Sequence, residues 1–179
     1  TYYLINNKKV QKNNILTRDE VNTGVTYLSN IYIWRLEEVF KTTIHECIHF
    51  FELDYRDTEI LTKHYINKYK CTSDNIKTYE GYVDFWAILI NSFLVTKLLN
   101  NPYKFFVNAI NLEKTFIEHQ SHKILRLNKN YNKYTPVLSY YVIKAELFLN
   151  LPKTLKILDK IQVTNEYFEY LLKLPIITP

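Results

Sequence analysis

The stretch Thr42-Thr43-Ile44-His45-Glu46-Cys47-Ile48-His49-Phe50-Phe51 makes the most specific chemical demand in this chain. It contains the pattern His-Glu-x-x-His, flanked by apolar residues. On an α-helix, two histidines four residues apart lie on one face, one turn above the other. Their imidazoles can then bind one metal ion, with Glu46 beside the ion and close to a bound water molecule. The alternative is a helix with two ordinary histidines and a surface glutamate.

The histidine pair needs a third ligand, because a catalytic zinc site uses three protein ligands and leaves a fourth position open. In the extended pattern His-Glu-x-x-His-x-x-Gly-x-x-His, position 52 would be glycine and position 55 histidine. The chain has Glu52 and Tyr55 there, so this metzincin arrangement fails. Glu59 and His64 follow on the next expected helix, but nothing near them is typical of a site.

Glu80 is the better candidate for the third ligand. Glu80 and Asp84 stand at positions i and i+4 on one face, at the start of an otherwise very apolar helix. Two carboxylates beside so much buried surface need compensation, because unpaired buried charge is costly. Zinc held by Glu80 would provide it, and Asp84 would accept the second N–H of a liganding histidine. Gly81 would leave space next to the site. The alternative is a capping carboxylate at Glu80 and a salt-bridged Asp84.

The motifs His45-Glu46-Cys47-Ile48-His49 and Glu80-Gly81-Tyr82-Val83-Asp84 together resemble the two-part signature of the gluzincin metallopeptidases, the thermolysin-like clan. The resemblance covers about residues 20–100 and implies a zincin-like fold with one Zn²⁺ per chain. The general pattern is also similar to uncharacterised HExxH proteins of large DNA viruses. The implied site residues are the zinc ligands His45, His49 and Glu80, the general base Glu46, and Asp84 as the hydrogen-bond partner of a liganding histidine.

The resemblance also implies where a peptide substrate and a further donor would lie. An extended substrate would pair with an edge strand, which by the layout of the clan is Asn22-Thr23-Gly24-Val25-Thr26. Related enzymes use a histidine or tyrosine from a later helix to stabilise the oxyanion. The candidates are Tyr140 and Tyr141, followed by His119 and His122, although an aromatic pair is more often part of the core than catalytic.

Hydrophobic periodicity and turn signals predict one α+β domain over residues 1–179, dominated by helices, with a small N-terminal antiparallel sheet packed on the motif helix. The domain divides into a sheet region (about 1–35), active-site helices (36–100) and a helical region (101–179). The expected strands cover residues 1–6, 21–27 and 31–34, and the expected helices cover 36–53, 58–69, 79–99, 102–127, 139–150, 152–161 and 165–174.

Several residues have a specific structural role in this prediction. Gly24 in a strand indicates a bulge or the close approach of another backbone. Thr78 is expected to cap the helix that carries Glu80, and Pro102 to open the next helix. The segment 6–14 is expected to be a turn or loop. The apolar stripe expected to bury the motif helix consists of Phe40, Ile44, Cys47, Ile48 and Phe51.

Composition excludes some classes of protein. The 179 residues suffice for one domain with a sizeable core, and 47% hydrophobic with 23% charged residues is an ordinary globular balance. The formal charge of +5 comes from lysines spread along the chain, with no run longer than Lys8-Lys9. A solvated basic surface is therefore favoured over a nucleic-acid-binding face, which usually gathers its charge into a patch.

The chain shows no sign of secretion or membrane insertion. Two cysteines, Cys47 and Cys71, make no disulfide framework, and no N-terminal signal pattern is present. The longest apolar stretch, residues 85–95, is too short to cross a bilayer and is expected to be a buried core helix. These features predict an intracellular (cytoplasmic) or virion protein.

The sequence therefore predicts a zinc-dependent metallopeptidase that acts on a peptide or protein substrate. The runner-up is a catalytically inactive zincin-like protein with a binding or structural role, for example in a virus particle. The intact Glu46 favours the enzyme, because a purely structural metal site gains nothing from a free general base. A third reading, a nucleic-acid-binding helical domain, rests only on the charge of +5.

Overall fold

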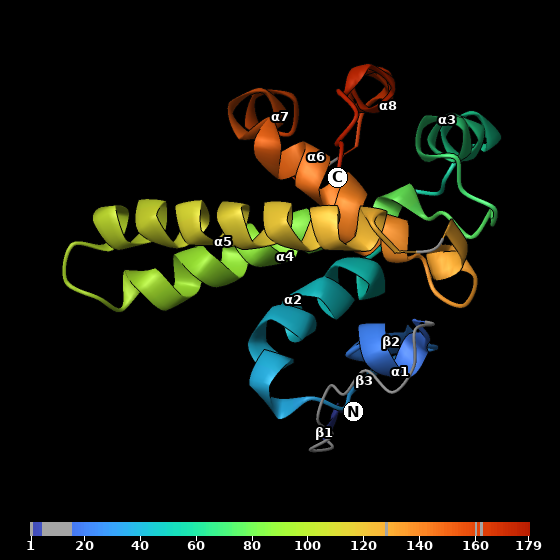
Figure 1. Cartoon of the computed structure of the whole chain (residues 1–179). Helices are drawn as coiled ribbons and strands as arrows, with labels where there is room; N and C mark the ends of the chain where they lie inside the picture. Colours follow the sequence, from blue (N-terminus) through green and yellow to red (C-terminus); the bar gives the residue numbers. More distant parts are fainter. Residues whose placement is uncertain (1, 5–15, 128, 160, 162) are drawn as a thin grey trace.

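Helices dominate the computed structural model of the chain, and a small sheet lies at one end (Figure 1). This arrangement confirms the predicted α+β class. The motif helix lies between the sheet and a pair of long helices, and most of the later helices lie on the opposite side of that pair (Figure 1). The residues that the structure describes are 2–4, 16–127, 129–159, 161 and 163–179.

The sheet contains three strands, β1 (Tyr2–Leu4), β2 (Gly24–Tyr27) and β3 (Asn30–Ile33), in the order β1-β3-β2. β2 and β3 form the predicted antiparallel pair, and β1 adds to β3 in parallel. β2 is therefore an edge strand among the described residues. The loop predicted over 6–14 lies outside the described residues.

The predicted strand over 21–27 begins too early. Residues Arg18–Val21 form a short helix, α1, instead. Its start is fixed by a capping box, in which Thr17 accepts from the backbone N–H of Asp19 and Glu20 accepts from the backbone N–H of Thr17. This local hydrogen bonding prevails over the β-branched composition of the segment.

The motif helix starts with a 3₁₀ turn at Leu36–Glu38 and continues as α2 (Val39–Phe50). Its predicted apolar stripe is wrong in part, because Phe40 is 77% exposed and Phe51 is 64% exposed. Ile48 is buried as predicted, but Ile44 and Cys47 are only partly buried. α2 contacts both the sheet and α4 (Thr78–Lys97), so its polar face is covered as well. The buried residues of α2 are Thr42, His45, Glu46 and Ile48.

All predicted helices are present, with shifted ends. α4 starts at Thr78, which is therefore not its cap; the carboxylate of Asp57 accepts from the Thr78 N–H instead. α5 starts at Pro102 with Asn101 as its cap, as predicted. The later helices are α3 (Glu59–Tyr69), α4 (Thr78–Lys97), α5 (Pro102–Leu125), the 3₁₀ turn η2 (Lys129–Asn132), the π-helix η3 (Ser139–Ile143), α6 (Lys144–Leu149), α7 (Leu151–Ile157) and α8 (Asn165–Lys173).

α4 and α5 run side by side as a long antiparallel pair (Figure 1). The first half of α4 is buried, but Phe93, Leu94 and Val95 are about half exposed, so the prediction of a buried helix over 85–95 holds only for its start. No helix in the described part of the chain is both long and apolar enough to cross a membrane.

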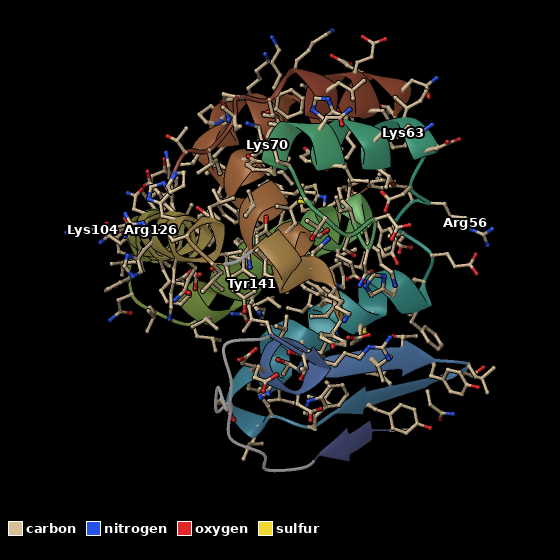
Figure 2. All side chains as sticks on the ribbon, turned by 45° about the vertical axis from the view of Figure 1, so that its right-hand side comes forward. Arg56, Lys63, Lys70, Lys104, Arg126 and Tyr141 are labelled. Atoms are coloured by element: carbon tan, nitrogen blue, oxygen red, sulfur yellow. The ribbon has the colours of Figure 1, made fainter. Side chains whose placement is uncertain are left out.

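Basic side chains are exposed on separate elements of the fold. Figure 2 shows Lys63 on α3, Arg56 and Lys70 on either side of that helix, and Lys104 and Arg126 at the two ends of α5. This spread agrees with the distribution of lysines along the sequence. The inference that these residues form a solvated surface rather than a nucleic-acid-binding face stays a prediction.

Candidate metal centre

Three side chains that the sequence predicts as metal ligands meet between α2 and α4. The Nε2 atoms of His45 and His49 are 3.1 Å apart. Oε2 of Glu80 lies 3.3 Å from each of them. Within the described residues these are the three side chains that could together hold a metal ion.

The outer nitrogen of each histidine faces a carboxylate. Nδ1 of His45 lies 3.1 Å from Oδ1 of Asp84, the predicted partner. Nδ1 of His49 lies 2.8 Å from Oδ2 of Asp54, a residue that the sequence reading missed. A carboxylate accepts the Nδ1–H proton, so both Nε2 atoms point their lone pairs toward Glu80. Both histidines are thus oriented as metal ligands.

The chemistry of this donor set fits a cation. Two imidazole nitrogens converge on Oε2 of Glu80, and this carboxylate oxygen is buried. Three acceptors facing one another repel unless a positive charge lies between them. Ligand atoms about 2.0–2.1 Å from a tetrahedral ion are separated by about 3.3–3.4 Å. The observed separations of 3.1–3.3 Å are close to this spacing.

The same carboxylates control the pKa of each histidine in the absence of metal. Burial alone would lower the pKa of His45, but Asp84 and Glu80 outweigh burial and raise it to about 9. Burial also acts against charge on His49, but Asp54 and Glu80 raise its pKa to about 10. Burial would raise the pKa of Glu80, yet hydrogen bonds from the two histidines lower it to about 2. In the metal-free protein, the imidazoles of His45 and His49 are therefore protonated near neutral pH, at the position that a metal ion could occupy.

We expect the metal-free protein to lose stability as the pH rises. The folded-state pKa values of His45 and His49, about 9 and about 10, lie above the value of about 6.5 for a histidine in an unfolded chain. Their protonation therefore stabilises the fold fully below about pH 6.5, and this contribution disappears as the pH rises through the folded-state values. Thermal unfolding of chelator-treated protein measures the effect, and a His45→Ala/His49→Ala variant should show a flatter profile. A metal-free stability that increases over this interval would contradict the prediction.

Glu46 lies beside the ligands and is almost fully buried, with 4% exposure. Its Oε2 accepts a hydrogen bond of 2.8 Å from the hydroxyl of Thr26 on β2. Burial raises the pKa of Glu46, although His45 and the bond from Thr26 oppose the change. A raised carboxyl pKa suits a group that must accept a proton and later return it near neutral pH.

Gly24 allows β2 to approach Glu46 closely. A Cβ at this position would lie 2.6 Å from Cγ2 of Thr42 and 3.0 Å from Oε1 of Glu46. The approach is close, but the two nearest atoms belong to side chains of α2 rather than to the predicted backbone; the nearest backbone atom is the carbonyl oxygen of Tyr32 at 3.1 Å. Gly81 has a different role from the predicted one, because its Cβ would meet Ile143 and the carbonyl oxygen of Ser139, both at 3.0 Å. Gly81 therefore lets η3 pack on α4.

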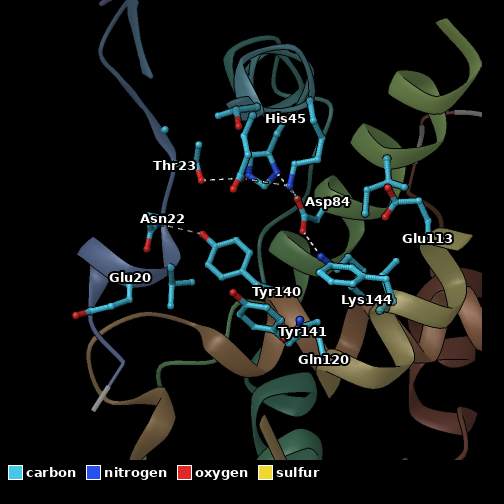
Figure 3. Close-up of a pocket in the computed structure, with 18 of the residues that line it drawn as sticks. Glu20, Asn22, Thr23, His45, Asp84, Glu113, Gln120, Tyr140, Tyr141 and Lys144 are labelled. Atoms are coloured by element: carbon cyan, nitrogen blue, oxygen red, sulfur yellow. Dashed lines mark hydrogen bonds and ion pairs between the residues drawn. The ribbon is translucent and has the colours of Figure 1, made fainter. Parts of the chain in front are cut away.

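Asp84 is held in its charged form by two cations. Nζ of Lys144 lies 2.6 Å from Oδ2 of Asp84, and Nζ of Lys41 lies 3.9 Å from Oδ1. Burial alone would raise the pKa of Asp84, but these ammonium groups outweigh burial and hold it well below its usual range. Lys144 takes one carboxylate oxygen and leaves the other to His45 (Figure 3). The sequence reading missed Lys144.

A cavity of about 650 Å³ opens beside His45, whereas His49 and Glu80 are not among the residues that line it. It extends from β2 and α2 to α4, α5 and η3, and it includes His45, Glu46 and Asp84 in its wall. Lys123 and Glu113 line the far side of this cavity on α5. The space is large enough for several residues of an extended chain to enter beside the candidate metal centre.

Tyr140 and Tyr141 both line this cavity, but only Tyr140 lies at the ligands (Figure 3). The Tyr140 ring centroid is 6.3 Å from that of His45. Burial, then the charges of Glu80 and Asp84, raise the pKa of Tyr140 well above 10, so its hydroxyl keeps its proton. Tyr141 lies instead next to Lys144, whose Nζ is 5.8 Å from its ring centroid. The geometry favours Tyr140 as the donor.

The predicted substrate strand is an edge strand, as expected, but only some of its residues turn their backbone groups toward the open edge. The Trp34 N–H donates to the carbonyl oxygen of Thr23, so the backbone of Thr23 faces β3. Strand alternation then turns the backbone groups of Gly24 and Thr26 toward the open edge, and those of Val25 toward β3. The carbonyl oxygen of Asn22 accepts from Trp34 Nε1 and from Arg35, so it is not free for a substrate.

The other candidate residues lie apart from the ligands. Glu59 pairs with Lys63 on the exposed face of α3. His64 is on the same helix, and His119 and His122 are on α5; these three do not line the cavity. Among the described residues, the structure therefore brings together the predicted ligands of α2 and α4 and none of these other candidates.

One comparison with known proteins gives a relative. A protein of Acanthamoeba polyphaga mimivirus, described as uncharacterized protein R210, is 26% identical over an alignment 186 residues long. The alignment covers 82% of this chain. The alignment covers 47% of the viral protein, so the chain spans about half the length of this relative. No protein-family model matches the chain, and no solved structure does. The geometry of the site is therefore the basis for proposing a function.

Proposed function

We propose that the chain is a zinc-dependent metallopeptidase of the gluzincin type with a zincin-like fold. One observation supports this proposal most strongly. Two imidazole nitrogens and the Glu80 carboxylate converge within 3.1–3.3 Å, and each histidine has its other nitrogen on a carboxylate. This arrangement provides two oriented imidazoles of borderline softness and one carboxylate, a set of three protein ligands that suits Zn²⁺ in a catalytic rather than a structural site.

Glu46 acts as the general base in this proposal. Its carboxylate follows His45 directly on α2 and lies in the wall of the cavity. When bound, Zn²⁺ supplies Lewis-acid chemistry, which lowers the pKa of a water ligand to about 7 and polarises a carbonyl group. Glu46 accepts the proton of the attacking water and delivers it to the leaving amine. The hydrogen bond from Thr26 orients the carboxylate without neutralising it.

The substrate lies extended along the free edge of β2. Gly24 and Thr26 present backbone N–H and C=O groups to that edge, and a peptide can pair with them as an added strand. Gly24 also lies against Oε1 of Glu46, so a peptide on this edge passes next to the general base. The buried phenol of Tyr140, on the opposite wall, provides the hydrogen-bond donor for the oxyanion.

The test is the cleavage of a mixture of quenched fluorescent peptides. We expect turnover by the metal-loaded protein, loss of turnover after treatment with a chelator, and recovery when Zn²⁺ is added back. Full zinc occupancy without cleavage of any peptide would overturn the proposed activity. It would instead support a catalytically inactive zincin-like protein with a binding or structural role.

A further inference from the structure

The side chain of Asn22 connects the two walls of the cavity. Asn22 follows α1 next to the sheet, whereas Thr135 precedes η3 and Tyr140 lies within it. The hydroxyl of Thr135 donates to Oδ1 of Asn22 at 2.8 Å. Nδ2 of Asn22 donates to the phenol oxygen of Tyr140 at 3.4 Å (Figure 3). These residues are about 113–118 positions apart in the sequence, so only the fold brings them together.

The backbone of Asn22 is fixed as firmly as its side chain. Its carbonyl oxygen accepts from Trp34 Nε1 at 3.1 Å and from the guanidinium of Arg35. Arg35 is almost fully buried, with 2% exposure, and it also bonds to the carbonyl oxygen of Asp19. Asn22 is therefore presented from a rigid part of the fold, and its amide cannot swing away without breaking several contacts.

The direction of these hydrogen bonds matters for the phenol. An amide has one accepting and one donating end, so Thr135 on Oδ1 leaves Nδ2 to face Tyr140. A phenol oxygen that accepts a hydrogen bond keeps its own proton for another acceptor. Tyr140 lies next to Glu80 and His45, so that proton is available on the side of the candidate metal centre.

We propose that Asn22 is a positioning residue, which holds the Tyr140 phenol oxygen so that its proton is directed at the reacting carbonyl oxygen. This inference rests on the proposed peptidase function. It replaces the substrate-binding role that the sequence predicted for Asn22. Thr135 sets the amide orientation, and Asn22 in turn sets the orientation of the donor, which is most effective when it is already in place before the reaction.

A double-mutant cycle tests the proposal by activity. We expect Tyr140→Phe to lower kcat about 10²–10³-fold, as for loss of an oxyanion donor. Asn22→Ala should lower kcat about tenfold with little change in KM, and should cause no further loss in the Tyr140→Phe background. Asn22→Asp keeps the size of the side chain but accepts the phenol proton, so it should lower kcat at least as much. The exposed Asn108→Ala is the matched control. Independent, multiplying effects of Asn22→Ala and Tyr140→Phe would overturn the proposal.

A second readout does not depend on turnover. In protein labelled with ¹³C at the tyrosine Cζ, the resonance of Tyr140 is identified by its absence in Tyr140→Phe. We expect this resonance to shift in Asn22→Ala and Asn22→Asp and to stay in place in Asn108→Ala, with zinc content unchanged in all three. A Tyr140 resonance that does not respond to Asn22→Ala in a folded, zinc-loaded protein would overturn the positioning role. Lack of peptide turnover in the wild type, with the resonance shift present, would count against the proposed function alone.

Discussion

Replacing Glu46 by glutamine is expected to abolish most peptide turnover without removing the metal. Glutamine has nearly the same shape, and its amide oxygen can still accept the hydrogen bond that Thr26 donates to Oε2. It cannot accept a proton from water, however. Loss of a positioned general base costs about 10²–10⁴-fold in rate. The measurement is kcat/KM on the best cleaved peptide, with zinc content determined on the same sample.

A variant of the neighbouring Thr26 distinguishes the proton-accepting role of Glu46 from the orientation of its carboxylate. Thr26→Val removes the hydrogen bond to Glu46 but keeps the carboxylate, so the rate should fall far less than in Glu46→Gln. Equal turnover by wild type and Glu46→Gln, at equal zinc occupancy, would rule out Glu46 as the base. It would also favour the runner-up role as an inactive zincin-like protein.

Replacing Asp84 by alanine is expected to affect both stability and metal binding. Asp84 is 6% exposed and Lys144 is 9% exposed, and their charges are 2.6 Å apart. Removing one partner of a buried ion pair leaves the other charge uncompensated, which costs about 3–5 kcal/mol of unfolding free energy. His45 also loses the acceptor of its Nδ1–H, and the loss of such a contact lowers metal affinity about 10–100-fold. Denaturant unfolding and zinc competition titrations measure the two effects.

The effect on zinc affinity can be separated from the effect on stability with a double variant. Asp84→Ala/Lys144→Met removes both charges, so we expect it to recover most of the lost stability. The zinc affinity should stay low, because His45 still lacks its partner. A double variant that regains full zinc affinity would contradict a role for Asp84 in orienting His45.

Most elements of the fold could be predicted because their signals are local. Thr58 and Asn101 cap α3 and α5 through their own side chains, and alternation predicts the β2–β3 pair. Burial was harder to predict, because the covered face of a helix depends on its neighbours. α2 packs on the sheet with one side and on α4 with the other, so Phe40 is exposed while Thr42 is buried.

The same difference between local sequence signals and tertiary packing applies to the candidate site. The spacing within each motif placed His45 beside His49 and Glu80 beside Asp84, because helical periodicity determines these positions. The two motifs meet through the packing of α2 against α4, which the family resemblance implied and no local signal shows. Asp54 carries no such signal. It reaches His49 because the chain turns back after α2, with Glu52 in the left-handed region at φ 53°. Lys144 is 60 residues from Asp84, and the packing of η3 and α6 against α4 brings it there.

Metal content tests the candidate centre most directly. We expect about one zinc ion per chain in the wild type and little or none in Glu80→Ala, because a catalytic site needs all three protein ligands. The control is Glu59→Ala, which changes a glutamate on the exposed face of α3 and should keep about one zinc ion per chain. The measurement is elemental analysis by mass spectrometry after reloading with zinc and removal of the excess. A wild type that binds no zinc, or a Glu80→Ala variant that keeps the full amount, would contradict the site formed by His45, His49 and Glu80.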